Sequence, residues 1–181
     1  MKEEIIIAGF GGQGVLSMGK ILAYSGLMDD KEVTWFPAYG PEQRGGTANV
    51  TVILSDEKIS SPVLDAYDIV IALNQQSLDK FAPKVKPGGV LIFDTNGIHK
   101  YPERDDIKVL PIDAMAATLE VGNSKAYNMV VLGALLEVMP YKLPIENVEK
   151  GLKKSLPERH HSLIPLNLKA IEKGKSLLKN Q

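Results

Sequence analysis

Short runs of apolar residues alternate with longer segments of helical periodicity along this chain. The runs predict six strands, at residues 4–8, 32–36, 47–54, 68–73, 90–93 and 107–112. The periodic segments predict helices at about 13–27, 75–81, 114–121, 124–139, 145–156 and 163–179. Strands that are apolar throughout are typical of a parallel sheet covered on both faces. The pattern therefore predicts an α/β fold: a doubly wound, mostly parallel, Rossmann-like sheet with helices on both faces and a helical C-terminal region.

Three local features refine this prediction. Pro37 directly follows the second strand and predicts that the strand ends there. The strand at 47–54 alternates polar and apolar residues and follows a long loop, so we expect an antiparallel insertion. Asn123 is a suitable N-cap for the helix that follows it. With 181 residues in total, we expect one domain over residues 1–181.

Composition excludes several classes of protein. Hydrophobic residues make up 44% and charged residues 24%, which is typical of a folded globular chain. The chain has no cysteine, which excludes disulfides, thiolate zinc sites, thiol chemistry and ordinary iron–sulfur ligation. With only three histidines, we expect no metal site. No apolar run is long enough to span a membrane, and the N-terminal residues lack the pattern of a signal peptide, so we expect a cytoplasmic chain without membrane contact.

Charge is distributed unevenly along the chain. Residues 150–181 contain eight Lys/Arg and two acidic residues, a balance of +6, whereas residues 1–149 contain thirteen and twenty, a balance of −7. A basic end of this kind suits an acidic partner, a phosphate-bearing ligand or nucleic acid. The plainer interpretation is a solvated helical face. Because the isoelectric point is near 6.3 and only 6% of residues are aromatic, we expect no nucleic-acid partner.

A glycine-rich turn follows the first predicted strand. The segment from Gly9 to Gly14 reads G-x-G-x-x-G, with Gly11 at the second fixed position and Gly12 and Gln13 after it. Glycines in this setting let the backbone approach a ligand, and the helix N-terminus favours an anion. One interpretation is a dinucleotide or another phosphate ligand, and the other is a tight strand–helix crossing that binds nothing. The second strand ends without Asp or Glu, which argues against conventional NAD binding.

A second glycine-rich segment runs from Tyr39 to Gly46. Arg44 precedes Gly45 and Gly46, which suits recognition of a carboxylate or phosphate by a planar fork of donors beside free backbone N–H groups. Glu42 could hold Arg44 in place, and Tyr39 offers an aromatic face. The alternative is a structural loop with an internal Glu42–Arg44 pair. We expect this loop to lie close to the glycine turn, at the carboxyl edge of the sheet.

These segments together resemble the gamma subunit of 2-oxoacid:ferredoxin oxidoreductases. The resemblance covers nearly the whole chain and is closer to the 2-oxoglutarate and branched-chain (ketoisovalerate) types than to the indolepyruvate type. It rests on the segments 9–15 and 39–49, the pairs 55–56, 61–62 and 74–75, and Asn128 with Leu132 and Gly133.

The resemblance implies a subunit of an enzyme that converts a 2-oxo acid and CoA to acyl-CoA and CO2 and passes electrons to ferredoxin. It implies that thiamine diphosphate, Mg²⁺ and 4Fe–4S clusters belong to partner alpha, beta and delta subunits. The isolated chain is then inactive and contains no catalytic residue. The alternative is a free-standing nucleotide-binding Rossmann-like protein.

CoA is the co-substrate that this subunit is expected to approach. The expected ligand- or CoA-proximal residues are Gly9, Gly11, Gly12, Gln13, Gly14, Tyr39, Glu42, Arg44, Gly45, Gly46 and Asn74. We also expect an apolar surface on the lone chain, around Trp35 and Phe36 or on the helix at 129–139, and self-association through it into a homo-oligomer.

Overall fold

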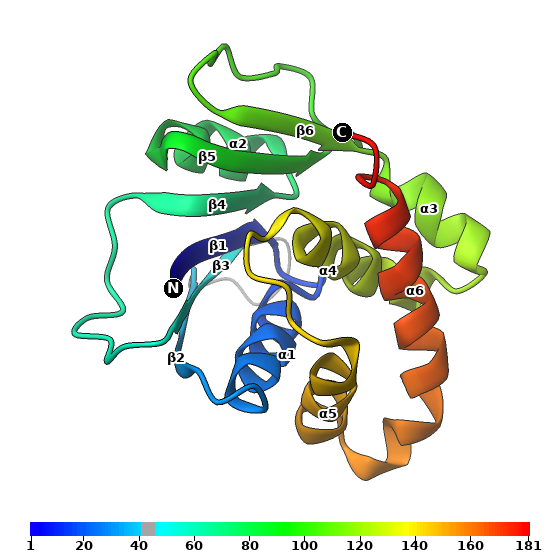
Figure 1. Ribbon diagram of the computed structural model, residues 1–181. Coiled ribbons are helices and arrows are strands. Elements are labelled where there is room, and N and C mark those ends of the chain that lie inside the picture. Colours follow the sequence, from blue (N-terminus) through cyan, green and yellow to red (C-terminus); the bar gives the residue numbers. More distant parts are fainter. Residues whose placement is uncertain (41–45) are drawn as a thin grey trace.

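A six-stranded sheet forms the centre of the molecule (Figure 1). The computed structural model describes residues 1–40 and 46–181. The strands are β1 (Lys2–Phe10), β2 (Glu32–Tyr39), β3 (Thr47–Ser55), β4 (Tyr67–Ala72), β5 (Val85–Asp94) and β6 (Lys108–Ile112), in the spatial order β2-β3-β1-β4-β5-β6.

The sheet is mixed. Strand β4 pairs in parallel with β1 and β5, and β5 pairs in parallel with β6. Strand β3 is antiparallel to both β1 and β2, which confirms the predicted antiparallel insertion. Strand β3 runs back along β1, with Thr47 opposite Phe10, and Tyr39 of β2 lies opposite Ala48. The end of β2 and the start of β3 therefore lie at the same end of the sheet as the glycine turn.

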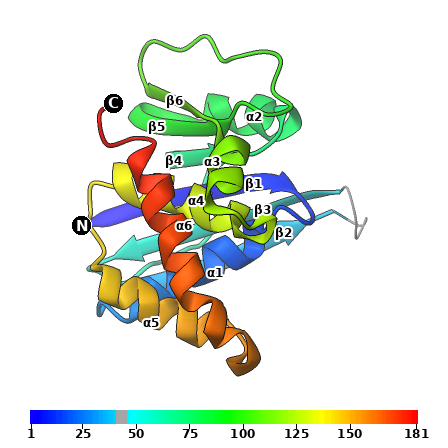
Figure 2. The same cartoon turned by 90° about the vertical axis from the view of Figure 1, so that its right-hand side faces the viewer.

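Helices cover both faces of the sheet, as predicted (Figures 1 and 2). One face packs against α1, α3, α4, α5 and α6, and the other against α2 and the short helix η1. Strand β1 shows the division: Ile5 and Ile7 belong to the first core, and Ile6 and Ala8 to the second. The bounds are α1 (Val15–Leu27), α2 (Gln75–Phe81), η1 (Ala82–Lys84), α3 (Ala114–Val121), η2 (Ser124–Ala126), α4 (Tyr127–Val138), α5 (Ile145–Ser155), η3 (Glu158–Leu163) and α6 (Ile164–Ser176).

Helix α4 lies inside the first layer and packs tightly against α6. A Cβ atom on Gly133 would come within 2.0 Å of the Ile171 carbonyl oxygen, and one on Gly174 within 1.9 Å of the Val130 carbonyl oxygen. Residues from Met129 to Leu136 are buried. The expectation of an exposed apolar surface on the helix at 129–139 is therefore wrong, because the helix is apolar all round and is enclosed by the sheet and α6.

Strand β2 is an edge strand and continues through Pro37. The prediction that Pro37 ends it is wrong. The Gly40 N–H donates to the Thr47 carbonyl at 3.0 Å, and alternation along the strand then turns the Pro37 nitrogen to the outer edge, where no donor is needed. Trp35 and Phe36 on this strand are 40% and 45% exposed. The predicted apolar surface at these two residues is confirmed.

Strand β5 begins earlier than its apolar run. Residues 87–89 are part of the strand. Tyr67 of β4 pairs with Val85 and Ile69 with Val90, so the two strands pair on both sides of these residues through a shift of register. Asn123 accepts a hydrogen bond from the Lys125 N–H and caps η2, which leads into α4.

No helix of the described residues has the length and apolar character needed to cross a lipid bilayer.

Candidate functional site

The carboxyl ends of β1 and β4 form a topological switch point. The chain leaves β1 for α1 on one face of the sheet and leaves β4 for α2 on the other (Figure 1). Such a point opens a crevice between the two strand ends, which is where ligands bind in open α/β sheets. The glycine turn and Asn74 both lie at this position.

The glycine turn adopts a conformation that side chains would not tolerate. Gly12 and Gly14 have φ angles of 97° and 74°, in the left-handed region that favours glycine. A Cβ on Gly9 would lie 2.5 Å from Gln13 Oε1, and one on Gly14 would lie 2.5 Å from Asn128 Nδ2. The glycines are therefore required both by backbone geometry and by the close approach of two amide side chains.

Gln13 spans the crevice itself. Its Oε1 accepts a hydrogen bond from the Phe10 N–H at 2.6 Å, and its Nε2 donates to the Leu73 carbonyl at 3.1 Å. Both ends of the amide are thus used within the chain. Gln13 is one of the residues expected near a ligand, and the structure places it as a brace between the glycine turn and the end of β4.

A hollow of about 970 Å³ opens beside the glycine turn. We call it the glycine hollow. It is lined by Phe10, Gly11, Gly12, Gly14, Val15, Leu16, Ser17, Tyr39, Gly40, Gly46, Thr47 and Ala48. The Gly11 N–H donates to the Gly46 carbonyl at 2.9 Å and ties the turn to the start of β3. Gly11, Gly12, Gly14, Tyr39 and Gly46, expected near a ligand, therefore share one hollow.

Other residues of the expected set lie elsewhere. Glu42, Arg44 and Gly45 fall outside the described residues. Gly9 is buried beneath Gln13. Asn74 follows β4 and caps α2 by accepting from the Ser77 N–H at 2.7 Å. Its Nδ2 is buried and has no partner among the described residues, and Asn74 does not line the glycine hollow.

The electrostatics of the glycine hollow favour an anion at one side. Val15, Leu16 and Ser17 of its lining form the first turn of α1, which contains no acidic residue. The free backbone N–H groups of this turn carry the positive end of the helix dipole. Phe10 and Tyr39 supply exposed aromatic surface. The hollow thus suits an elongated ligand with an anionic part and an apolar part.

Some lining residues were not predicted from the sequence. Phe10 lies within the first glycine-rich segment, and Leu16, Ser17 and Thr47 lie just after one or the other segment. Their nearness in sequence to the glycines is the signal that could have identified them. A partly buried pair was also missed: the Tyr127 hydroxyl donates to Asp94 Oδ2 at 2.6 Å. Burial, with the nearby Asp94 carboxylate, strongly raises the pKa of Tyr127, so this pair is a structural contact between β5 and α4.

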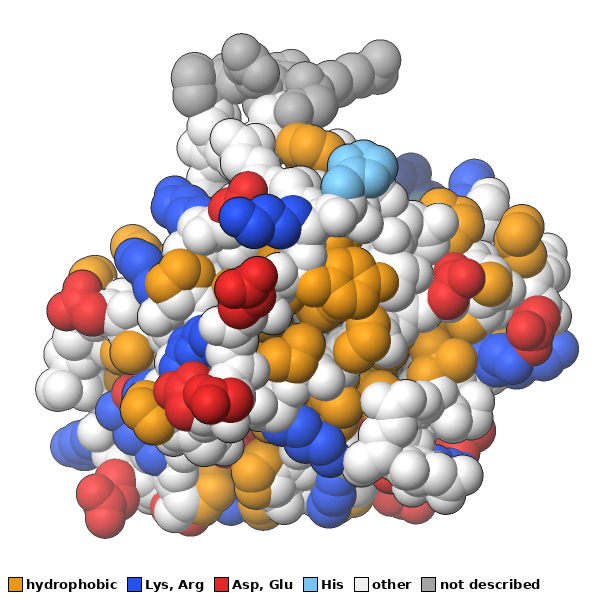
Figure 3. Space-filling model, turned by 90° about the horizontal axis from the view of Figure 1, so that it is seen from above, with side chains coloured by type: hydrophobic (Ala, Val, Ile, Leu, Met, Phe, Trp, Pro, Cys, Tyr) orange, Lys and Arg blue, Asp and Glu red, His pale blue; other side chains and the backbone are white. Residues whose placement is uncertain are grey.

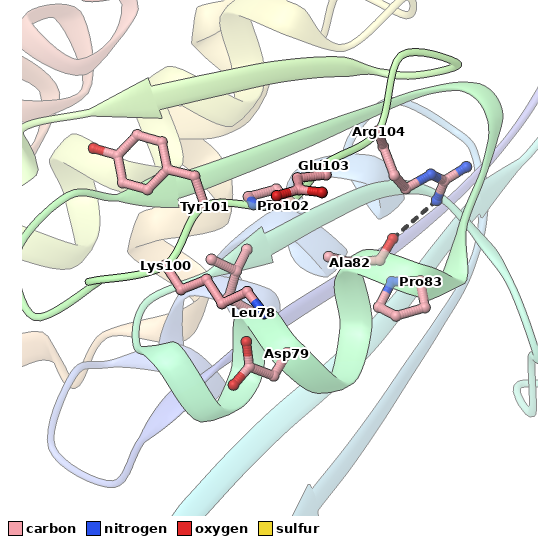
Figure 4. A pocket seen from close by; sticks show the side chains of 9 residues that line it. All are labelled: Leu78, Asp79, Ala82, Pro83, Lys100, Tyr101, Pro102, Glu103 and Arg104. Atoms are coloured by element: carbon pink, nitrogen blue, oxygen red, sulfur yellow. Dashed lines mark hydrogen bonds between the residues drawn. The ribbon is translucent and has the colours of Figure 1, made fainter.

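A different hollow, of about 400 Å³, lies between α2 and the loop that follows β5 (Figure 4). Arg104 closes one side of it, donating to the Ala82 and Val85 carbonyls and pairing with Asp106. Gln75 holds the other end of the loop through the Lys100 carbonyl at 3.0 Å. Because the Arg104 donors are already used, this hollow offers less to an anion than the glycine hollow does.

The surface above β5 and β6 mixes all side-chain classes. Seen from above, hydrophobic side chains gather near its middle, with acidic and basic side chains interspersed around them (Figure 3). Within residues 1–40 and 46–181, no group of three or more His, Asp or Glu side chains is arranged to hold a metal ion. Without cysteine, the chain also lacks the ligands of an ordinary iron–sulfur cluster.

Comparison with known proteins identifies relatives over the whole chain. The 2-oxoglutarate synthase subunit KorC of Methanocaldococcus jannaschii is 36% identical over 183 residues, which cover 99% of this chain and 95% of KorC. The ketoisovalerate oxidoreductase subunit VorA of Methanothermobacter marburgensis is 37% identical over 171 residues. That match covers 94% of this chain and 35% of VorA, so the chain spans about a third of the VorA length.

Solved structures show the same architecture. The gamma subunit of a keto/oxoacid ferredoxin oxidoreductase from Geobacter sulfurreducens matches with a TM-score of 0.82 and 30% identity, over 97% of this chain and 95% of that chain. A 2-oxoglutarate:ferredoxin oxidoreductase from Magnetococcus marinus, with 2-oxoglutarate, coenzyme A and succinyl-CoA bound, matches with a TM-score of 0.87 and 28% identity, over 99% of this chain and 31% of that one.

The resemblance found in the glycine-rich segments is confirmed by a family model. The model for pyruvate ferredoxin/flavodoxin oxidoreductase matches residues 4–177. This chain therefore belongs to the pyruvate ferredoxin/flavodoxin oxidoreductase family.

Proposed function

We propose that this chain is the gamma component of a 2-oxoacid:ferredoxin oxidoreductase. The observation that carries the proposal is the match, over nearly the full length of both chains, to KorC and to a solved gamma subunit. The assembled enzyme would convert a 2-oxo acid and CoA to acyl-CoA, CO2 and one proton. The two electrons released go to two ferredoxins. The complex would work in the cytoplasm, with ferredoxin as its acceptor.

The chemical step belongs to partner chains in this proposal. Thiamine diphosphate with Mg²⁺ supplies the carbanion chemistry in alpha and beta subunits, and 4Fe–4S clusters in beta and delta subunits carry the electrons. The absence of cysteine from this chain supports that division, because such clusters need thiolate ligands. The ketoisovalerate and 2-oxoglutarate relatives favour a branched-chain 2-oxo acid or 2-oxoglutarate as substrate.

The glycine hollow would receive part of CoA. Its helix N-terminus suits a phosphate, and the aromatic surfaces of Phe10 and Tyr39 suit the adenine ring or the pantetheine arm. Arg44 joins this proposal on its sequence context alone. One of the similar solved structures contains coenzyme A, which supports a CoA role for the fold.

Activity of the reconstituted complex tests this proposal. The isolated chain should show no turnover with any 2-oxo acid, and full activity should require the partner chains. In the complex, Tyr39→Ala should raise the KM for CoA several-fold while leaving the KM for the 2-oxo acid unchanged. Tyr101→Ala is the matched control, because Tyr101 is an exposed tyrosine that lines the other hollow.

Two results would contradict the proposal. Turnover by the isolated chain would assign the chemical step to it. Binding of NAD or another nucleotide by the lone chain, with no stable partner, would favour the free-standing nucleotide-binding protein instead. Two observations argue against that alternative. The Gln13 side chain spans the crevice where a nucleotide would lie, and β2 ends without the acidic residue that usually binds the ribose.

A further inference from the structure

Asn96 joins the ends of two strands at the carboxyl edge of the sheet. Its side-chain Nδ2 donates to Asp94 Oδ1 at 3.0 Å and to Asp113 Oδ1 at 3.1 Å. Asp94 is the last residue of β5, and Asp113 follows β6 and caps α3. One amide group therefore holds together two carboxyl groups that would otherwise repel each other. We call this arrangement the Asn96 bridge.

The sequence around the Asn96 bridge is chemically labile. Asn96 is the only asparagine of this chain that a glycine follows. In an Asn-Gly pair, the backbone nitrogen of the glycine attacks the side-chain amide carbon with little hindrance, because the glycine has no Cβ. Asparagine is for this reason among the heat-labile residues.

The local structure leaves this reaction open. Asn96 and Gly97 are both exposed to water, and the Gly97 N–H donates to no backbone carbonyl of the described residues. A Cβ built on Gly97 would meet no neighbouring side chain or backbone within 4 Å. The attacking nitrogen is therefore free, and no part of the fold encloses the two residues.

We propose that Asn96 is a site of spontaneous deamidation, and that the modified chain loses the Asn96 bridge. The Gly97 nitrogen forms a bond to Asn96 Cγ, the Cγ–Nδ2 bond breaks, and the nitrogen leaves as ammonia with the proton of the Gly97 N–H. Water then opens the cyclic imide and gives aspartate or isoaspartate at position 96. The reaction needs no other reactant, and no electrons are transferred.

The product reverses the chemistry of the bridge. The amide donors are replaced by a carboxylate, which donates no hydrogen bond and adds a third negative charge beside Asp94 and Asp113. Asp94 is 2% exposed, so water does not solvate its carboxylate once the amide has gone. The end of β5 and the start of α3 should therefore separate.

Asp94 also connects the bridge to the glycine turn. Its Oδ2 accepts from the hydroxyl of Tyr127, the first residue of α4, at 2.6 Å. The next residue, Asn128, packs against the glycine turn, since a Cβ on Gly14 would lie 2.5 Å from Asn128 Nδ2. Displacement of Asp94 should therefore loosen the start of α4 and, through it, one wall of the glycine hollow.

Ageing of the full chain at mildly alkaline pH, followed by peptide mass spectrometry, tests the chemical step. Asn96 should gain one mass unit several-fold faster than Asn123, with isoaspartate among the products. Asn123 is the internal control, because Ser124 follows it and carries a Cβ that hinders the attack. Conversion of Asn96 no faster than that of Asn123 would overturn the proposal.

A pair of glycine variants separates the assigned chemistry from a general effect on the fold. Gly97→Ala supplies the missing Cβ and should slow the conversion of Asn96 several-fold. Gly88→Ala is the matched control, because the two glycines have similar φ angles of 74° and 79° and open space around them. Proline precedes Gly88, so this variant should leave the rate unchanged. Equal slowing by both variants would overturn the proposal.

The consequence for the fold is tested with the product itself. Asn96→Asp should lower the melting temperature more than Asn96→Ala, which removes the same donors and adds no charge. High salt should narrow the difference between these two variants, because it screens the repulsion among the carboxylates.

Hydrogen exchange locates the change. The aged chain and the Asn96→Asp variant should both lose amide protection at the starts of α3 and α4, whereas α5 should keep its protection. A melting temperature of Asn96→Asp equal to that of the wild type, or protection unchanged at α3 and α4, would overturn the assigned role of the bridge. These measurements use the lone chain, so the inference does not rest on the proposed function.

Discussion

Gln13 Nε2 donates a hydrogen bond to the Leu73 carbonyl oxygen at 3.1 Å. The same side chain accepts from the Phe10 N–H at 2.6 Å. One amide therefore connects the glycine turn after β1 to the end of β4, across the switch point of the sheet. The shape of the glycine hollow depends on this brace, because Phe10 and Gly11 are held on its rim.

Removal of the Gln13 side chain should loosen the glycine turn. Gln13→Ala leaves the Leu73 carbonyl and the Phe10 N–H without their partner, and we expect unfolding free energy to fall by about 1–3 kcal/mol. Urea denaturation measures the loss. Gln13→Glu keeps an acceptor for Phe10 but loses the donor to Leu73, so it should also destabilise the chain. An unchanged urea midpoint for both variants would show that the two Gln13 hydrogen bonds contribute nothing to the free energy of unfolding.

The α4–α6 crossing should not tolerate a methyl group. Gly133→Ala brings a Cβ to within 2.0 Å of the Ile171 carbonyl oxygen, so the two helices must separate. We expect the free energy of unfolding to fall by about 3 kcal/mol or more. The added methyl group meets backbone atoms, so no flexible side chain can move to make room for it. Gly40→Ala is the control, because its Cβ would meet Thr47 Oγ1 at an ordinary 3.5 Å. Equal melting temperatures for the two variants would refute this account of the crossing.

Glu3 should make the stability of the chain depend on pH. Burial raises the pKa of its carboxyl above the ordinary value of 4.5, although a hydrogen bond from the Tyr141 N–H opposes the shift. Because the folded pKa is raised, the unfolded chain ionises first as pH rises. Below pH 4.5 the Glu3 carboxyl is protonated in both states and does not lower the free energy of unfolding. As pH rises through the folded pKa, Glu3 lowers that free energy progressively.

Glu3→Gln removes this titration and should gain stability relative to wild type between about pH 4 and pH 7. Thermal unfolding at the two pH values measures the difference. Glu103→Gln, at an exposed carboxyl, serves as the control. A stability difference for Glu3→Gln that is the same at both pH values would contradict the assigned burial effect.

The β2 edge should cause self-association of the lone chain. Trp35 and Phe36 expose apolar surface on a strand whose outer edge is unpaired within the described chain. In sedimentation velocity, the wild-type chain should form dimers or larger species as concentration rises, and a Trp35→Lys/Phe36→Lys double variant should remain monomeric. Val63→Lys, at a residue that is 68% exposed in a loop, should leave association unchanged. A strictly monomeric wild type would refute this prediction.

Much of the fold follows from local sequence pattern. The order of strands and helices and the capping by Asn123 were predicted, because each depends on residues near one another in the chain. The antiparallel β3 was also predicted, from its own alternation of polar and apolar residues, although its partner β1 is distant in sequence. The errors have tertiary causes. Pro37 is tolerated because β2 lies at the edge, and the helix at 129–139 is enclosed because α6 covers it. Neither fact is visible in the local pattern.

The candidate site was predicted in outline only. The described residues of the second glycine-rich segment, Tyr39, Gly40 and Gly46, do lie beside the glycine turn, because β1 and β2 end at the same edge of the sheet. The role of Gln13 as a brace could not be predicted, because its partner Leu73 lies 60 residues away.

The most direct test of the central claim is to purify this chain with a tag from its native host, without oxygen. Proteins retained with it are identified by mass spectrometry, and the visible spectrum of the eluate is recorded. A subunit of a 2-oxoacid:ferredoxin oxidoreductase should bring down cluster- and thiamine-diphosphate-bearing partners in constant proportion, in a brown eluate. A colourless chain that emerges alone would contradict the account.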